Sequence, residues 1–133
     1  MLQDAYSGRL KLNGKEHGET LMAASNYATS LLTLKRFEEA KALLRETMPV
    51  AQRALGKGHR LTLKTRWNYA QALCRDGNAT LADLREAVTT LEDADRIARR
   101  VLGSAHPITT GIEHDLRVIR AALPIREALS GRP

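Results

Sequence analysis

The feature that most constrains this chain is an internal repeat. The triplet Asn26-Tyr27-Ala28 returns 42 residues later as Asn68-Tyr69-Ala70. Other landmarks move in step with it: Thr20-Leu21 with Thr62-Leu63, Gly14 with Gly56, and His17 with His59. Self-similarity at a period of a few tens of residues is typical of stacked repeat architectures. Such stacks usually bind other proteins along an extended concave surface.

Hydrophobic spacing indicates two helices in each repeat. Apolar residues recur every three or four positions from Glu19 to about Leu34, and the pattern restarts from Phe37 to Leu55. Gly56 offers the left-handed conformation that commonly ends a helix. The same reading places later helices at 61–75, 81–102 and 108–123.

Two prolines are expected to perturb these helices. Pro49 lacks the amide that would bond the carbonyl of Arg45, so we expect a kink near residues 45–49. Pro124 is expected to end the last helix.

The predicted fold is all-α: a right-handed α-solenoid of antiparallel helix-turn-helix repeats, with about five main helices. The repeat domain covers residues 14–123, with units at about 17–56 and 59–103 and a half unit at 106–123. Residues 1–13 are expected to be the remnant of a preceding helix or an N-terminal cap, and 124–133 a flexible tail. The second unit is five residues longer, and the extra length falls in 76–83. Exposed ends of so short a stack favour pairing with another copy.

Charge and cysteine content narrow the partner and the compartment. The net charge is +6, and residues 47–75 contain six basic side chains and no acid, which favours an acidic partner. There is no apolar run of membrane-spanning length and no signal-peptide pattern, so no membrane association is expected. A single cysteine, Cys74, excludes an internal disulfide, and we expect a reducing, cytoplasmic setting.

Several motifs in register, over about residues 10–123, resemble tetratricopeptide repeats of the kinesin-light-chain-like type. Its Leu-Gly-x-x-His-Pro-x-Thr motif is similar to the run from Leu102 to Thr109, its Asn-Leu-Ala motif to Asn-Tyr-Ala at 26–28 and 68–70, and its Gly-x-Tyr-x-Glu-Ala motif to Lys35 to Ala40. The chain departs from the pattern at Gly18 and Arg60, where the family has proline, and at Asp115-Leu116-Arg117, where it has Asn-Leu-Ala. The last departure favours a capping role for the third helix.

A polar stripe on the first helix of each unit is the candidate binding site. Positions three and four residues apart share a helix face, which gives this set of candidate peptide-binding residues: Asn26, Thr29, Lys64, Trp67, Asn68, Gln71 and Arg75. The family resemblance implies that this helix lines the concave groove and that Asn26 and Asn68 pair with a peptide backbone. Lysine and arginine suit carboxylates, and tryptophan is common at interface hot spots. The alternative leaves Trp67 in the core and Asn68 as a spacer or cap.

Catalytic and metal-binding readings are set aside. His17, His59 and His106 occupy equivalent positions a repeat apart, too far for one ion, and each is expected to order its loop or the start of the next helix. Cys74 is expected to be a buried, inert thiol. No phosphate-binding or dinucleotide-binding glycine loop is present. We therefore predict no enzymatic activity, no cofactor and no bound metal.

The sequence thus predicts a non-catalytic protein-interaction scaffold whose concave groove binds an extended, acidic peptide. Two alternatives stay open: a self-assembling repeat module, and non-specific nucleic-acid binding through residues 47–75. Specific nucleic-acid binding is not expected, because no recognition motif accompanies the basic charge.

Overall fold

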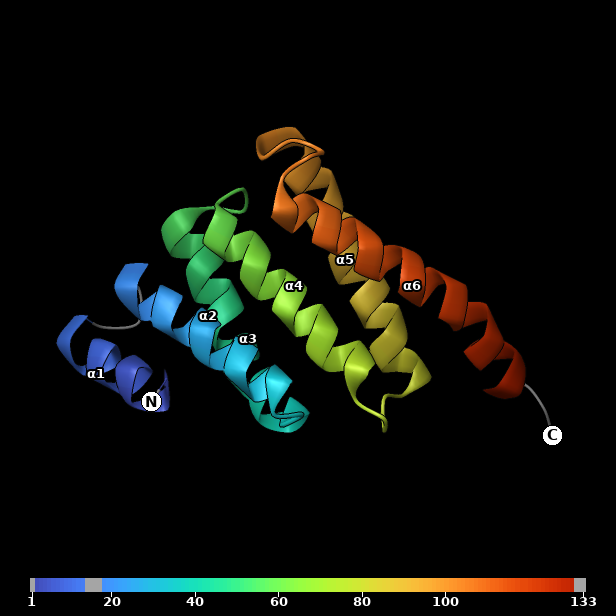
Figure 1. Ribbon diagram of the computed structural model, residues 1–133, viewed down its shortest axis with the longest axis horizontal. Helices are drawn as coiled ribbons and strands as arrows, with labels where there is room; N and C mark the ends of the chain where they lie inside the picture. Colours follow the sequence, from blue (N-terminus) through green and yellow to red (C-terminus); the bar gives the residue numbers. More distant parts are fainter. Residues whose placement is uncertain (1, 14–17, 131–133) are drawn as a thin grey trace.

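A computed structural model describes residues 2–13 and 18–130, and this part of the chain is all-helical (Figure 1). Its six helices are α1 (Leu2–Asn13), α2 (Gly18–Thr33), α3 (Phe37–Leu55), α4 (Arg60–Arg75), α5 (Leu81–Val101) and α6 (Pro107–Ser130). The prediction of an all-α helical repeat solenoid is confirmed. Within the described ranges, no helix combines the length and the apolar character needed to cross a membrane.

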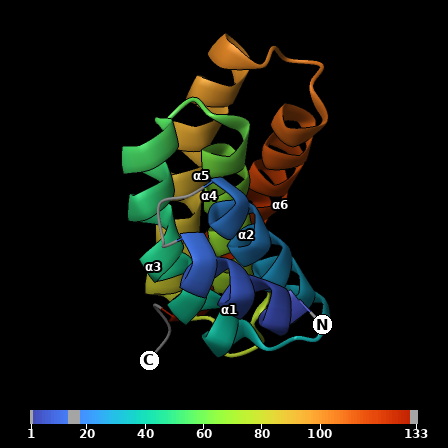
Figure 2. The same ribbon diagram turned by 90° about the vertical axis from the view of Figure 1, so that its left-hand side faces the viewer.

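The helices form two layers that differ in spacing. Figures 1 and 2 show α2, α4 and α6 side by side, with α3 and α5 behind them, while α1 packs on α2 at the N-terminal end. Backbone contacts join α2 to α4 and α4 to α6, whereas no comparable contact joins α3 to α5 in the described part. The layer whose helices approach more closely is the inner side of a curved stack. The face carried by α2, α4 and α6 is therefore the candidate concave surface.

The turns between units repeat the same chemistry. Gly56 and Gly103 follow α3 and α5 with φ of 90°, a conformation that side-chain-bearing residues rarely adopt. Nδ1 of His59 accepts a hydrogen bond of 3.0 Å from the backbone nitrogen of Leu61, and Nδ1 of His106 accepts one of 3.1 Å from Ile108. The prediction that these histidines order the start of the next helix is confirmed. Gly14 and His17 lie outside the described residues.

Leucine and isoleucine side chains form the core between the layers. The main cluster runs from α2 to α6, and its largest fully buried members are Leu44, Leu63, Leu73, Leu91 and Ile112. A smaller cluster, Leu31, Leu32, Ala40 and Ala72, holds α2 against α3 and α4. Burial of each large apolar side chain contributes about 1.5–3 kcal/mol. The core thus packs α4 against α2, α3, α5 and α6, and α4 carries most of the predicted site.

The last helix is longer than predicted. It continues through Pro124 to Ser130, so the prediction that Pro124 ends it is wrong. A proline removes only the bond to the carbonyl four residues earlier, and tertiary contacts hold the next turn. Nη2 of Arg126 donates to the backbone oxygen of Ala79 at 2.8 Å, and Glu127 lies 3.8 Å from Arg85. Pro49 likewise lies within α3 without ending it.

The inserted segment 76–83 forms a defined loop. Asp76 accepts a 3.0 Å hydrogen bond from the backbone of Asn78, and Thr80 and Asp83 form a reciprocal capping box at the start of α5. Lys41 is only 6% exposed, and its Nζ lies 2.6 Å from Glu38 and 3.7 Å from Asp76. This buried lysine ties the loop to α3.

Candidate functional site

The face formed by α2, α4 and α6 carries a hollow, here called the first hollow. It encloses about 890 Å³ of space, including open solvent, and its lining comes from all three helices: Met22, Asn26, Arg60, Leu61, Lys64, Trp67, Pro107 and Ile108. Three of the predicted site residues, Asn26, Lys64 and Trp67, meet there. Residues 60, 64 and 67 follow one another at helical spacing, so they form one stripe on α4.

The first hollow is positively charged. Arg60 is exposed and Lys64 is partly buried, and neither forms an ion pair with a carboxylate across residues 2–13 and 18–130. Two cations without ion-pair partners on the rim of a hollow raise the local potential for an anionic group. Arg60 was not among the predicted site residues, although its position directly after the capping His59 puts it one turn before Lys64.

Trp67 belongs to both the core and the groove. Its ring packs against the main core cluster and also lines the first hollow. Nε1 donates a 2.6 Å hydrogen bond to Oδ2 of Asp115 on α6. The ring also lies directly over Gly111, where an added Cβ would come within 2.4 Å of it. Contacts from α6 therefore fix the indole as one wall of the hollow.

Asn68 does not face the groove, and the expectation that it is exposed there is wrong. The side chain is only 4% exposed, and its Nδ2 donates to Oγ1 of Thr29 at 3.3 Å. Thr29 itself is exposed and donates to the carbonyl of Ser25 at 3.0 Å. One residue along a helix is a rotation of about 100°, which turns Asn68 from the groove toward α2. Asn68 therefore joins two units, while Asn26, its counterpart in the first unit, is exposed.

Gln71 makes the corresponding bond between the next two units. Its Nε2 donates to Oδ2 of Asp115 at 3.1 Å, so one carboxylate oxygen accepts from both Gln71 and Trp67. Asp115 occupies the position in the third unit that Asn26 and Asn68 occupy in the first two. Sequence reasoning treated this departure as a sign of a cap. The repeat register gives its equivalence to Asn68, but its contact with Gln71 is known only from the structure.

Arg75 lies apart from the first hollow, at a second hollow farther along α4. This second hollow encloses about 560 Å³, including open solvent, and is lined by Cys74, Arg75, Leu84, Asp115, Val118, Ile119 and Ala122. Burial, and next the charge of Asp115, raise the pKa of the Cys74 thiol to about 11. The raised pKa keeps the thiol protonated at neutral pH, but the side chain is only partly buried, whereas a buried thiol was expected. The predicted stripe is thus divided by the Trp67, Gln71 and Asp115 contacts.

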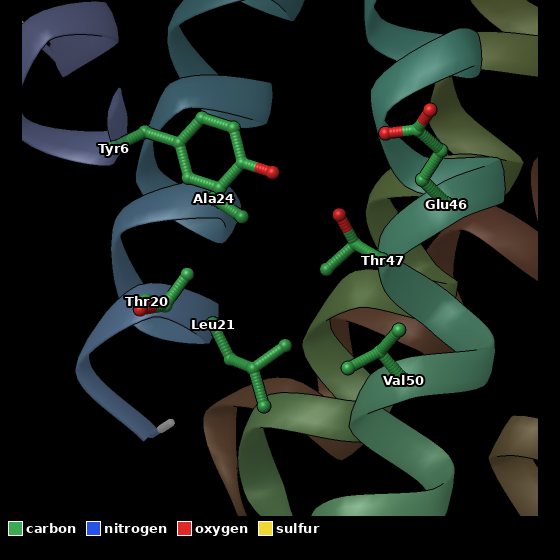
Figure 3. A pocket seen from close by; sticks show the side chains of 7 residues that line it. All are labelled: Tyr6, Thr20, Leu21, Ala24, Glu46, Thr47 and Val50. Carbon is green, nitrogen blue, oxygen red and sulfur yellow. The ribbon is translucent and has the colours of Figure 1, made fainter. Parts of the chain in front are cut away.

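A third, smaller hollow lies where α1 joins the stack (Figure 3). Its lining contains none of the predicted site residues: Tyr6, Thr20, Leu21, Ala24, Glu46, Thr47 and Val50. Burial, and next the charge of Glu46, raise the pKa of the Tyr6 hydroxyl. The hydroxyl of Thr47 already donates to the carbonyl of Leu43 at 2.7 Å. We interpret this hollow as the seam between α1, α2 and α3.

Metal-binding side chains do not converge in the described part of the chain. No group of three or more His, Cys, Asp or Glu residues there is arranged to hold an ion. His59 and His106 are instead engaged at helix starts.

Comparison with known proteins finds a similarity over part of the chain. Residues 19–82 match a family model described as tetratricopeptide repeat, and this range spans α2, α3, α4 and the start of α5. A search of curated proteins gave no significant match. Tetratricopeptide repeats generally mediate protein–protein interactions, and the family is a non-enzymatic scaffold family. Residues 19–82, with their paired helices, are therefore similar to tetratricopeptide repeats.

Proposed function

We propose that this chain is a non-catalytic interaction protein that binds an extended, acidic segment of a protein partner in the first hollow. The observation that carries the proposal is the placement of Arg60 and Lys64, without ion-pair partners in the described chain, beside the indole of Trp67. Carboxylates of the partner would pair with these cations in a site that apolar walls partly shield from water, where such pairs are stronger than on an open surface.

The other lining residues supply what an extended segment needs. The amide of Asn26 offers both a donor and an acceptor to a peptide backbone, and it is exposed on α2. Met22, which is 50% exposed, and Leu61 provide apolar surface on either side of the hollow. Asn68 is assigned a different role from the one that the family resemblance implied: it holds α4 to Thr29 on α2.

Charge placement argues against a nucleic-acid surface. The basic residues of 47–75 do not share one face, because Arg60 and Lys64 line the first hollow whereas Arg53 and Arg66 line a different depression with Tyr69. Arg66 is also engaged by Asp93 at 2.5 Å. A phosphate backbone needs several cations along one continuous track, and this division does not provide one.

Self-association is the second candidate function. Three apolar side chains, Val118, Ile125 and Leu129, are 54–64% exposed along α6. Their spacings of seven and four residues place them on one helix face. Sedimentation over a hundredfold range of concentration tests this candidate, since a constant monomer mass would exclude it.

Peptide titration tests the groove. We would titrate a labelled acidic peptide, its Asn/Gln isostere and a short DNA duplex at low and moderate salt, and follow polarisation and Trp67 emission. Saturable binding of the acidic peptide alone at moderate salt is expected. Lys64→Glu is expected to weaken binding about tenfold or more, which corresponds to about 1.4 kcal/mol.

The matched control is Lys57→Glu. Lys57 is exposed in the loop before α4 and lines neither the first nor the second hollow, so this variant changes the net charge equally without touching the groove. Equal losses of peptide affinity in the two variants would show that overall charge, and not the groove, causes the effect. Absence of saturable peptide binding would overturn the proposal.

A further inference from the structure

We propose that Asp115 makes this groove selective for a charge pattern rather than for acidity alone. The partner segment would place an acidic side chain over Arg60 and Lys64, a non-acidic residue over Asp115, and an apolar side chain in the second hollow. This inference rests on the proposed function and specifies which acidic segments bind.

The first observation is the state of the Asp115 carboxylate. Trp67 and Gln71 both donate to the same oxygen, Oδ2, and no described residue donates to Oδ1. No cation in residues 2–13 and 18–130 forms an ion pair with this partly buried side chain. An acceptor and an uncompensated negative charge therefore face the groove between the two hollows. A peptide N–H or a basic side chain is attracted there, and a second carboxylate is repelled.

The second observation is the different lining of the two hollows. Arg60 and Lys64 supply the charged groups of the first hollow. Five of the seven residues around the second are apolar or thiol side chains, and its other members are Arg75 at the rim and Asp115. Leu84 and Ile119 form its nearly buried base, at 5% and 4% exposure. One hollow thus suits a carboxylate and the other an aliphatic side chain.

The third observation is that the partition is held in place before any partner arrives. Nε1 of Trp67 donates a hydrogen bond to Asp115, and the indole ring packs over Gly111. Asp115 and Gly111 lie one turn apart on α6. Because both contacts come from α6, the position of the Trp67 ring is fixed relative to the Asp115 carboxylate. A fixed wall lowers the entropic cost of recognising a fixed spacing.

Helix geometry sets that spacing. Eleven residues separate Lys64 from Arg75 on α4, a rise of about 16 Å. An extended peptide covers this distance in about five residues. Gln71, which marks the height of Asp115, is seven residues from Lys64, or about 10 Å and three peptide residues. The expected segment is therefore acidic at one position, non-acidic about three residues on, and apolar about five residues on.

A peptide series tests the pattern in the wild-type chain alone. The reference peptide carries Asp, then Asn three residues on and Leu five residues on, in a neutral background and in both chain directions. Replacing the central Asn by Lys or Asp is expected to give the affinity order Lys, Asn, Asp, with the Asn peptide binding at least about fivefold more tightly than the Asp peptide. A flat or reversed order would overturn the inference.

A variant then assigns the discrimination to the carboxylate. Asp115→Asn keeps an oxygen acceptor for Trp67 and Gln71 but removes the charge, so the Asn and Asp peptides are expected to bind it within about twofold of each other. The matched control is Glu113→Gln, which removes a charge two residues earlier on α6, where Glu113 is paired with Arg99 and Arg117. Glu113→Gln is expected to keep the wild-type discrimination.

The outcomes separate this inference from the proposed function. If the reference peptide binds through Lys64 but discrimination persists in Asp115→Asn, Asp115 is not the selective group and the groove stands. If neither the reference peptide nor a uniformly acidic one binds the wild-type chain, the proposed function itself fails.

Discussion

The contact between α2 and α4 and the contact between α4 and α6 are two versions of one interface. In the first, Asn68 donates to Thr29; in the second, Gln71 donates to Asp115. The pairs occupy equivalent repeat positions, with the direction of donation reversed. The first pair is neutral and the second is charged, so a single substitution of Asn by Asp changes what the same architecture presents to a partner.

The two interfaces also differ in bulk. Ser25 in the first unit corresponds to Trp67 in the second, and Met22 and Lys64 correspond to Gly111 in the third. Trp67 inserts between α4 and α6 above Gly111, and α4 is in closer backbone contact with α2 than with α6. A hollow lies on either side of this wedge. The repeated residues thus set the packing of the helices, and the positions that differ between units, such as Trp67 and Gly111, shape the two hollows.

Removal of the wedge is expected to have the largest effect on stability. Trp67→Ala should lower the free energy of unfolding by about 3 kcal/mol, because a large, mostly enclosed ring leaves a cavity. Trp67→Phe retains most of the apolar contact and loses only the bond to Asp115, so about 1–2 kcal/mol is expected. Urea denaturation followed by circular dichroism measures both. Equal losses would show that the hydrogen bond, and not the ring, holds α6.

The thiol of Cys74 reports the charge of the third unit. Its pKa of about 11, against 9.0 for an ordinary thiol, lowers the thiolate fraction at neutral pH about a hundredfold. Alkylation should therefore be slow at pH 7.5 and rise until the pH passes that pKa. Because the charge of Asp115 contributes to the raised pKa, Asp115→Asn should shift the rate profile to lower pH. A profile unchanged by the variant would leave burial as its sole cause.

A methyl group at Gly111 tests the fit of the wedge. Alanine normally stabilises a helix relative to glycine by about 1 kcal/mol, but the new Cβ would lie 2.4 Å from the Trp67 ring. Gly111→Ala is therefore expected to destabilise the protein by about 1–3 kcal/mol through overpacking. The control is Gly8→Ala in α1, where a Cβ meets nothing within 4 Å and slight stabilisation is expected. In a Trp67→Ala background the cost at Gly111 should vanish; its persistence would locate the strain elsewhere.

Sequence reasoning succeeded where local chemistry decides the structure. The positive φ at Gly56 and Gly103 needs only the absence of a side chain, and the role of His59 at a helix start needs only a bond to Leu61, two residues on. It failed where a neighbouring helix decides. The end of α6 depends on the bond from Arg126 to Ala79, 47 residues away in sequence.

The candidate site shows the same division. Helical spacing put Lys64 and Trp67 on one stripe of α4, and both side chains line the first hollow. The spacing of residues along α4 does not give the angles at which α2 and α6 cross it. Those angles decide that α2 covers Asn68 and that Gln71 reaches Asp115 on α6. Interhelical angles scatter by about 15–20° for the same class of packing, enough to move a side chain between groove and seam.

Thr62 and Thr109 occupy equivalent positions in the second and third units, and substitutions there are expected to have the smallest effects on stability. Oγ1 of Thr62 donates to the carbonyl of Ala51, whereas the equally buried Oγ1 of Thr109 has no hydrogen-bond partner among the described residues. Thr62→Val should cost about 1 kcal/mol for the lost bond, while Thr109→Val should be neutral or slightly stabilising, because it removes a buried hydroxyl that gains nothing in the fold. Denaturant unfolding midpoints measure both changes in stability, provided that the two variants unfold with the same m value. If Thr109→Val costs as much as Thr62→Val, the hydroxyl of Thr109 must form a hydrogen bond. The contact of α6 with α5 would then resemble the contact of α4 with α3, where Thr62 bonds to Ala51.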